Sequence, residues 1–210
     1  MNGVSPPDRE RFEPGGAATT ADQARGGDSD AVRAVRGGEV AAFGRLVERY
    51  QRRVFGLSLM LTRDPAAAEE LAQDAFVRAF THLDAYDAAR PFYPWLATIA
   101  VRLSQNWLTQ RARHESREGQ PGAADAEAKG ADPLTLLIAD EESRRLWRWV
   151  AALPTGERAA AILYYRQELT VDDVARALGV SGGTVKTLLF RARRHLRRSV
   201  GGAGEAGDRT

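Results

Sequence analysis

The sequence predicts an all-α protein of two small helical domains joined by a flexible acidic linker, the C-terminal domain containing a helix-turn-helix. In every apolar stretch the apolar residues recur three and four positions apart, which is the spacing of one helix face. No stretch alternates apolar and polar residues as a half-buried strand would. A segment rich in Gly, Ala, Pro and acidic residues separates the two helical regions and is typical of a flexible connection.

The composition argues against several kinds of site. The chain of 210 residues has no cysteine, so we expect neither disulfides nor cysteine-bound zinc, and the three histidines stand apart in the sequence. We therefore expect no metal and no other cofactor. No apolar run approaches the roughly 18 residues that cross a bilayer, and the N-terminus lacks the apolar core of a signal peptide. The protein is expected to stay in the cytoplasm, without insertion into a membrane.

Residues 1–29 are predicted to form a disordered N-terminal tail, because they are rich in Gly, Ala, Pro and Asp and lack helical periodicity. This tail is either a dispensable extension or a regulatory arm. Folded structure is expected from Asp30 onward, and the first helical domain is predicted to cover residues 30–114.

The first domain begins with a long amphipathic helix predicted over residues 39–61. Asp64 then caps a second helix, with Pro65 at its first position and Phe80 and Leu83 at the end of its apolar stripe. The outer face of this helix is mainly acidic and polar. It carries Glu69, Glu70, Gln73, Asp74 and Arg78. Such a face favours a protein partner over DNA, although an ordinary solvated face has the same pattern.

Aromatic residues gather in the loop predicted over residues 84–94, which contains Tyr86, Phe92 and Tyr93 and precedes Trp95. Exposed aromatics beside arginine stack on unpaired bases, and the same residues equally suit a small satellite core. The helix predicted from Trp95 has no acidic residue between positions 96 and 113. Its outward side chains are Arg102, Gln105, Asn106, Arg111 and Arg113. This helix is a candidate nucleic-acid surface.

Residues 115–133 are predicted to form the acidic flexible linker, and residues 134–200 the second helical domain. A helix that starts near Leu134 should end at Pro154. Another is expected over residues 157–167, with Tyr165 on its buried face. Residues 201–210 are predicted to form a second disordered tail, since they are rich in glycine.

The helix-turn-helix is predicted over residues 169–198. Thr170 suits the N-cap of the first helix, with Asp173 three positions on to complete the reciprocal bond. Gly179 suits the left-handed position that ends that helix, and Ser181 caps the next one. The second helix buries a stripe with three- and four-residue spacing. Its members are Val185, Leu188, Leu189, Ala192 and Leu196.

The outer face of this second helix is strongly basic. It carries Lys186, Arg191, Arg193, Arg194, Arg197 and Arg198, with no carboxylate among them. The N-terminal residues of a recognition helix reach base edges, so the candidates for readout are Ser181, Gly182, Gly183, Thr184, Lys186 and Thr187. Arg191 and Arg194 lie further along and suit phosphates, which position the helix without reading sequence. A solvated basic face is the alternative.

These stretches resemble the extracytoplasmic-function (ECF) group of bacterial sigma factors. In the first domain, AEELAQDAF at residues 68–76 is similar to a core-binding helix of that family. PFYPWLATIA at residues 91–100 resembles the segment that leads to the helix meeting the −10 promoter element. In the second domain, residues 153–165 and 169–197 resemble the −35-binding domain, with S-x-G-T-V-K at residues 181–186 as the most specific part.

The resemblance implies an alternative sigma factor that binds core RNA polymerase and directs promoter recognition, −10 melting and transcription initiation. The residues implied to dock on the polymerase clamp are Glu70, Gln73, Asp74 and Arg78. Those implied to bind the −10 element are Tyr86, Asp87, Arg90, Tyr93, Trp95, Arg102 and Asn106, with the loop capturing a flipped base. The residues implied to bind the −35 element are the helix-turn-helix residues named above. An anti-sigma factor is an expected further partner.

Some positions depart from the family pattern. Glu70 stands where Asp is usual and Thr187 where Ser is usual, and Glu168 replaces a usual Gly. Arg102 and Asn106 occupy positions where Asn and Asp are common, so the −10 specificity of a relative does not carry over to this chain.

Two other classes of function remain as alternatives. A stand-alone helix-turn-helix regulator would need an effector pocket or a dimer interface, and the first domain shows no candidate pocket. We do not expect an enzyme, since the neighbouring carboxylates Glu69 and Glu70 point about 100° apart on a helix and cannot converge on one substrate.

Overall fold

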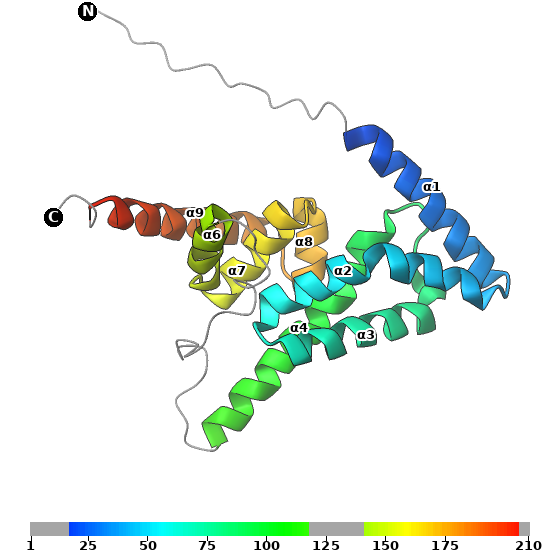
Figure 1. Ribbon diagram of the computed structural model, residues 1–210, viewed down its shortest axis with the longest axis horizontal. Helices are drawn as coiled ribbons and strands as arrows, with labels where there is room; N and C mark the ends of the chain where they lie inside the picture. Colours follow the sequence, from blue (N-terminus) through cyan, green and yellow to red (C-terminus); the bar gives the residue numbers. More distant parts are fainter. Residues whose placement is uncertain (1–16, 118–140, 206–210) are drawn as a thin grey trace, which may run out of the picture.

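The computed structural model describes residues 17–117 and 141–205, and both ranges are helical with no strand in either (Figure 1). The N-terminal module contains α1 (Ala17–Arg36), η1 (Val40–Ala42), α2 (Phe43–Thr62), α3 (Pro65–Thr81), η2 (Leu83–Ala85) and α4 (Phe92–Arg117). The C-terminal module contains α6 (Glu141–Ala151), α7 (Thr155–Ala161), the π-helical turn η3 (Ile162–Arg166), α8 (Val171–Leu178) and α9 (Gly182–Glu205). The predicted all-α fold of two helical units is confirmed.

The core of the N-terminal module lies where α2, α3 and α4 pack against one another. Leu46, Val54 and Leu57 of α2 are fully or almost fully buried. Opposite them, α3 buries small side chains such as Ala68 and Ala75, which allow its backbone to approach closely. As predicted, Asp64 caps α3 by accepting a hydrogen bond from the Ala67 amide (3.1 Å) in front of Pro65.

The predicted tail of residues 1–29 is wrong for its second half, because α1 begins at Ala17 and runs to Arg36. Asp28, expected outside the fold, is 3% exposed and accepts a hydrogen bond from the Tyr50 hydroxyl (2.5 Å). It also forms an ion pair with Arg49 of α2. The prediction relied on the content of Gly, Ala, Pro and Asp and on the lack of helical periodicity, whereas α1 contacts α2 through the bonds of Asp28. Residues 1–16 lie outside the described residues.

The C-terminal module packs α7 and α8 against α9. Val185, Leu189 and Ala192 of α9 are buried as predicted, and Leu188 and Leu196 are partly buried. Glu157 of α7, a buried carboxylate, bonds to Nδ1 of His195 on α9 at 2.6 Å.

The helix predicted over residues 157–167 is interrupted. It is α-helical to Ala161 and continues as the π-helical turn η3. The wider turn shifts the side-chain register, so Tyr165, predicted on the buried face, is half exposed and meets Tyr164 edge to face.

Three predicted boundaries shift as well. The helix expected from Trp95 begins at Phe92, and α4 extends to Arg117, beyond the predicted domain end at 114. In the predicted tail 201–210, α9 continues to Glu205. The rest of the predicted linker, and the helix start near Leu134, lie outside the described residues.

The two modules are in contact rather than separate. Helix α8 packs against α4, and one continuous apolar core runs through both modules (Figure 1). Gln167, which follows η3, is 3% exposed and lies at the centre of the contact. Its side-chain Oε1 accepts hydrogen bonds from Tyr93 Oη (2.5 Å) and Arg53 Nε (3.0 Å). Its main-chain oxygen accepts another bond from Arg53 Nη2 (2.6 Å). We call this set of bonds the Gln167 contact.

Candidate nucleic-acid interface

The helix-turn-helix formed by α8 and α9 has the caps that the sequence predicts. Thr170 accepts a hydrogen bond from the Asp173 amide (3.1 Å) and donates to the Asp173 carboxylate (2.7 Å). Gly179 adopts the left-handed conformation with φ 68°. Ser181 accepts from the Thr184 amide at 3.1 Å and so begins α9. These local features fix where α8 begins, where it ends and where α9 begins.

The hydroxyl groups of the candidate readout residues are already engaged within α9. The Ser181 and Thr184 hydroxyls lie 2.9 Å apart, and Thr187 donates to the main-chain oxygen of Gly183 (3.1 Å). Thr187 therefore retains only acceptor capacity toward a base. Lys186 is exposed and has no hydrogen-bond or ionic partner in the described chain, so it is the candidate best able to donate to a base edge.

The arginines of α9 lie on its solvent side. Arg191 and Arg194, the predicted phosphate contacts, are exposed and make no ion pair with any carboxylate that the structure describes. The same holds for Arg193, Arg197 and Arg198. Unpaired guanidinium groups along an exposed helix are suited to a polyanion such as the DNA backbone.

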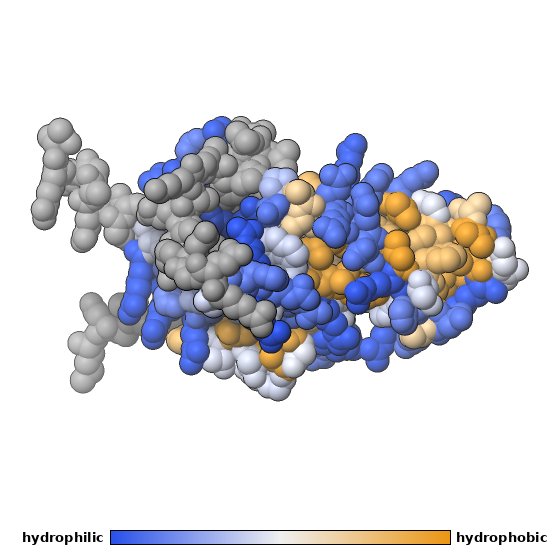
Figure 2. Space-filling view, turned by 90° about the horizontal axis from the view of Figure 1, so that it is seen from below, coloured by the Kyte–Doolittle hydropathy of each residue, from blue (hydrophilic) through white to orange (hydrophobic). Residues whose placement is uncertain are grey.

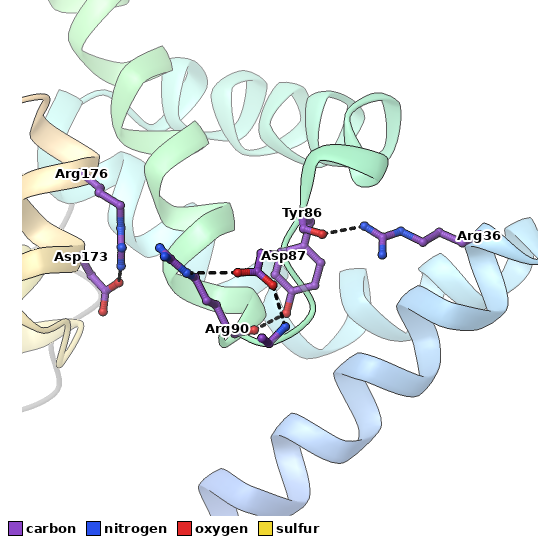
Figure 3. Close-up of polar contacts among 7 residues, drawn as sticks. Arg36, Tyr86, Asp87, Arg90, Asp173 and Arg176 are labelled. Carbon is purple, nitrogen blue, oxygen red and sulfur yellow. Dashed lines mark hydrogen bonds and ion pairs between the residues drawn. The ribbon is translucent and has the colours of Figure 1, made fainter.

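The aromatic loop before α4 is closed, which corrects the alternative of exposed stacking platforms. Tyr86 is 3% exposed, and its ring contacts Phe92 and Trp95 with centroid distances of 5.3 and 5.1 Å. Its hydroxyl donates to the main-chain oxygen of Arg90 (Figure 3). The polar residues of the loop, Asp87 and Arg90, are exposed and form an ion pair at 3.3 Å.

The C-terminal end of α1 forms hydrogen bonds with the main chain of this loop. Arg36 donates to the main-chain oxygens of Leu83 (2.7 Å) and Tyr86 (2.6 Å), as Figure 3 shows for Tyr86. Sequence analysis assigned no role to Arg36, because its partners Leu83 and Tyr86 lie 47 and 50 positions further along the chain. The double glycine at 37–38 indicates that a helix ends there, but not that it ends beside this loop.

Tyr93, predicted to bind the −10 element, is buried in the Gln167 contact at 4% exposure. Its ring stacks on Tyr50, and the Arg53 guanidinium lies over it at 3.7 Å. Burial raises the pKa of Tyr93 to about 12, although Arg53 and Arg166 lower it in part. Burial also raises the pKa of Tyr86 to about 12, with the Asp28 and Asp87 carboxylates adding to the effect. Both hydroxyls are therefore neutral at physiological pH.

The remaining −10 candidates lie on α4. Arg102 and Asn106 are exposed one turn apart, and Trp95 is partly buried. Trp107 and Arg111 extend the same helix, with the Arg111 guanidinium 5.1 Å from the Trp107 ring centre. Figure 3 shows the Asp173–Arg176 pair of α8 beside the start of α4, where the modules pack.

The outer face of α3 combines charge with exposed apolar side chains. Glu70, Gln73, Asp74 and Arg78 are all exposed, as predicted. Val77 is 62% exposed among them, and Phe80, predicted to face the core, is 40% exposed with one edge on Phe43. Figure 2 shows apolar residues, in orange, gathered among charged ones in the right half of the view. An exposed mixed surface of this kind is typical of a protein interface.

A metal site and a membrane-spanning helix were also sought in the part of the chain that the structure describes. Within residues 17–117 and 141–205, no group of three or more His, Asp or Glu side chains is arranged to hold a metal ion. Among these residues, no helix has the length and apolar character of a membrane span.

Comparison with known proteins finds a matching family for each module. The family described as Sigma-70 region 2 matches residues 46–114, and Sigma-70, region 4 matches residues 143–196. The chain is 30% identical over 183 residues to the ECF RNA polymerase sigma-E factor of Escherichia coli, covering 82% of this chain and 94% of that protein. The chain belongs to the ECF sigma factors.

Further relatives agree with this assignment. The chain is 28% identical over 176 residues to the ECF sigma factor SigW of Bacillus subtilis, which covers 80% of this chain and 94% of that protein. A probable sigma factor RfaY of Xanthomonas campestris is 37% identical over 164 residues, but the chain spans only 40% of its length.

Two solved structures share the fold of this sigma factor. CnrH, solved in complex with the cytosolic domain of CnrY, has a TM-score of 0.61 and 22% identity, covering 84% of this chain and 98% of that one. The sigma factor RpoE of Bartonella quintana, solved with the anti-sigma factor NepR, has a TM-score of 0.58 and 21% identity, covering 74% and 94%. At this identity the likeness concerns the fold alone.

Proposed function

We propose that this sigma factor binds core RNA polymerase in the cytoplasm and directs it to promoters through two DNA-binding surfaces. The observation that carries the proposal is the capped recognition helix α9, whose exposed cations have no carboxylate partner in the described chain. Membership of the ECF sigma factors supports promoter DNA, rather than another polyanion, as the ligand of this surface.

At the −35 element, α9 enters the major groove with its N-terminal end toward the bases. Lys186 donates to a base edge, and Arg191 and Arg194 contact phosphates on either side. Ser181 mainly holds the helix start, and the lack of side chains at the partly buried Gly182 and the exposed Gly183 permits close approach of the DNA there.

The polymerase binds the outer face of α3. Glu70 and Asp74 supply negative charge to basic groups of the polymerase, and Gln73 and Arg78 supply hydrogen bonds. Val77 and Phe80 extend this proposed surface with apolar area at its centre. Burial of exposed apolar side chains provides affinity, and the charged rim provides orientation.

The −10 element binds the exposed parts of the loop and α4, through Asp87, Arg90, Arg102 and Asn106, with Trp95 at their edge. Tyr93 is covered by the C-terminal module, so its access to a flipped base requires that the Gln167 contact opens. Tyr86 becomes available only if its bond to Arg90 breaks. We therefore assign the present arrangement to the free protein and an open one to the promoter complex.

A partner that holds the factor inactive also fits. The two solved structures of similar fold were determined with bound partner proteins, one of them named as an anti-sigma factor. The surface on α3 with Val77 and Phe80 offers the apolar area that such a partner would cover.

In vitro transcription tests the proposed function. Purified chain, core RNA polymerase and candidate promoter fragments should yield defined transcripts, whereas the chain alone should bind the same DNA weakly. Asp74→Ala should abolish transcript formation while leaving the helical content of the chain intact, with the exposed Arg45→Ala as control. Tight operator binding by the chain alone, with no transcripts, would instead indicate a stand-alone regulator.

A further inference from the structure

A small polar cleft lies where the two modules meet, beside the Gln167 contact. Its volume is about 230 Å³, below the range of roughly 300–1,000 Å³ that is typical of pockets for drug-sized ligands. Arg52, Arg53 and Gly56 of α2 form one wall with Met60, and Arg166, Gln167 and Glu168 form the other. We call it the seam cleft.

The seam cleft has an excess of positive charge. Three arginines line it against one carboxylate, that of Glu168. Arg52 and Arg166 are exposed and form no ion pair or hydrogen bond with any residue in the described parts of the chain. Many other arginines of this structure are paired with carboxylates, as Arg36, Arg90 and Arg176 are. Two unpaired cations on opposite walls repel each other and oppose closure of the modules.

The base of the cleft is fixed and offers a further donor. Arg53 is held by Gln167 and by the Tyr93 ring. Gln167 lines the cleft, and both of its side-chain bonds use Oε1, so its amide nitrogen makes no hydrogen bond within the described chain. That nitrogen is not among the buried polar atoms that lack a partner, so it can donate to an anion in the cleft.

These features select the class of ligand. Guanidinium groups bind phosphate oxygens with paired hydrogen bonds, and three of them around one small volume suit a doubly or triply charged anion. The cleft is too small for a duplex backbone with its flanking sugars. We propose that the seam cleft binds a small phosphorylated anion of diphosphate size, held between Arg52 of the N-terminal module and Arg166 of the C-terminal module.

Binding at this place has a consequence for the whole chain. The anion bridges the two modules and neutralises the repulsion across the cleft, so it stabilises the closed arrangement that buries Tyr93. A ligand that prefers the closed state must weaken whatever requires the open state, by linkage. Reduced promoter use in the presence of the anion rests on the proposed function, whereas anion binding itself does not.

Calorimetric titration of the full chain with inorganic pyrophosphate tests the site. We expect saturable one-to-one binding, and Arg52→Ala and Arg166→Ala should each weaken it at least tenfold. Arg45→Ala is the matched control, because Arg45 lies on the same helix two turns away, exposed and outside the cleft. Pyrophosphate should also shorten the distance between fluorophores placed on the two modules, and neither cleft variant should show this change.

Several outcomes would overturn the proposal. Equal affinity of Arg45→Ala and the cleft variants would place the anion elsewhere, and equal binding of sulfate would reduce the site to general anion attraction. Dependence on Arg52 and Arg166 seen only with a short single-stranded oligonucleotide would make the cleft a nucleic-acid contact. All these measurements use the free chain, so a failure of the transcription assay would leave their interpretation unchanged.

Discussion

At the scale of single residues, local bonding separates the side chains that are free to bind from those that hold the structure. Ser181, Thr184 and Thr187 each use their hydroxyl inside α9, whereas Lys186 does not. The buried Tyr86 and Tyr93 likewise act first as parts of the core. The residue type alone does not distinguish these roles, because a hydroxyl group serves a helix cap and a DNA contact equally well.

The Lys186→Ala and Arg191→Ala variants should affect promoter recognition in different ways. Loss of a base contact should cost about 1–3 kcal/mol and relax preference at one −35 position, whereas loss of a phosphate contact should weaken all promoters similarly and reduce the salt dependence of binding. Transcription from promoters with single −35 substitutions, measured at several salt concentrations, checks this. Equal behaviour of the two variants would refute the division of roles.

The two tyrosines predict an alkaline loss of stability. In the unfolded chain a tyrosine ionises near pH 10, but in the fold Tyr86 and Tyr93 hold their protons to about pH 12. Between these values the folded state binds more protons, so the free energy of unfolding falls as pH rises. Urea unfolding at a series of pH values should show this fall. Tyr93→Phe should make it shallower, and an unchanged slope would contradict the assignment.

At the scale of elements, α1 supports the loop that is proposed to bind the −10 element. Its buried Asp28 ties it to Tyr50, and Arg36 at its end holds the carbonyl groups of the loop before α4. Gly26 and Gly27 lie in the interior of α1 and lower its intrinsic helix propensity there, where the contacts of Asp28 with α2 support the helix. The region first interpreted as a tail therefore includes a structural support.

Arg36→Ala should loosen the loop. It removes donors from the carbonyls of Leu83 and Tyr86, and leaving partly buried acceptors unpaired should lower the free energy of unfolding by about 1–3 kcal/mol. Amide exchange over residues 83–90 should accelerate. Arg33→Ala is the control from the same helix, since its surface pair with Asp30 should contribute less than about 1 kcal/mol. Equal effects of both variants would exclude a specific role for Arg36.

At the scale of the whole molecule, the contact between the modules determines what is accessible. The Gln167 side chain accepts hydrogen bonds from both Tyr93 and Arg53. Contact between the modules therefore also buries Tyr93. The basic face of α9 stays outside the contact. In this arrangement one proposed DNA surface is available and part of the other is covered.

Gln167→Ala should shift the chain toward an open form. It removes the acceptor shared by Tyr93 and Arg53, while the main-chain bond from Arg53 remains. Small-angle X-ray scattering should report a larger radius of gyration. Gln167→Glu is the control, because a carboxylate keeps the acceptor and adds attraction to Arg53, so it should remain closed. An unchanged radius for Gln167→Ala would show that packing of α8 on α4 alone closes the modules.

The sequence by itself determined the features that depend on neighbours along the chain. Periodicity identified the helices, and the caps at Asp64, Thr170 and Ser181 are formed by residues within three positions of their partners. The exposed basic face of α9 follows from the same local rule. The membership of the chain in a family was also readable, because its signatures lie in short continuous segments.

Only the tertiary structure decided which side chains are covered. Asp28 meets Tyr50, Gln167 meets Tyr93, and Arg36 meets Leu83 across long stretches of sequence. Helical periodicity indicates that a face is apolar but not which element packs on it. Phe80 and Tyr165 were therefore placed inside, and for Tyr93 an exposed position and a place in a small core were both left open. Burial is a property of two surfaces, and the chain order specifies only one of them.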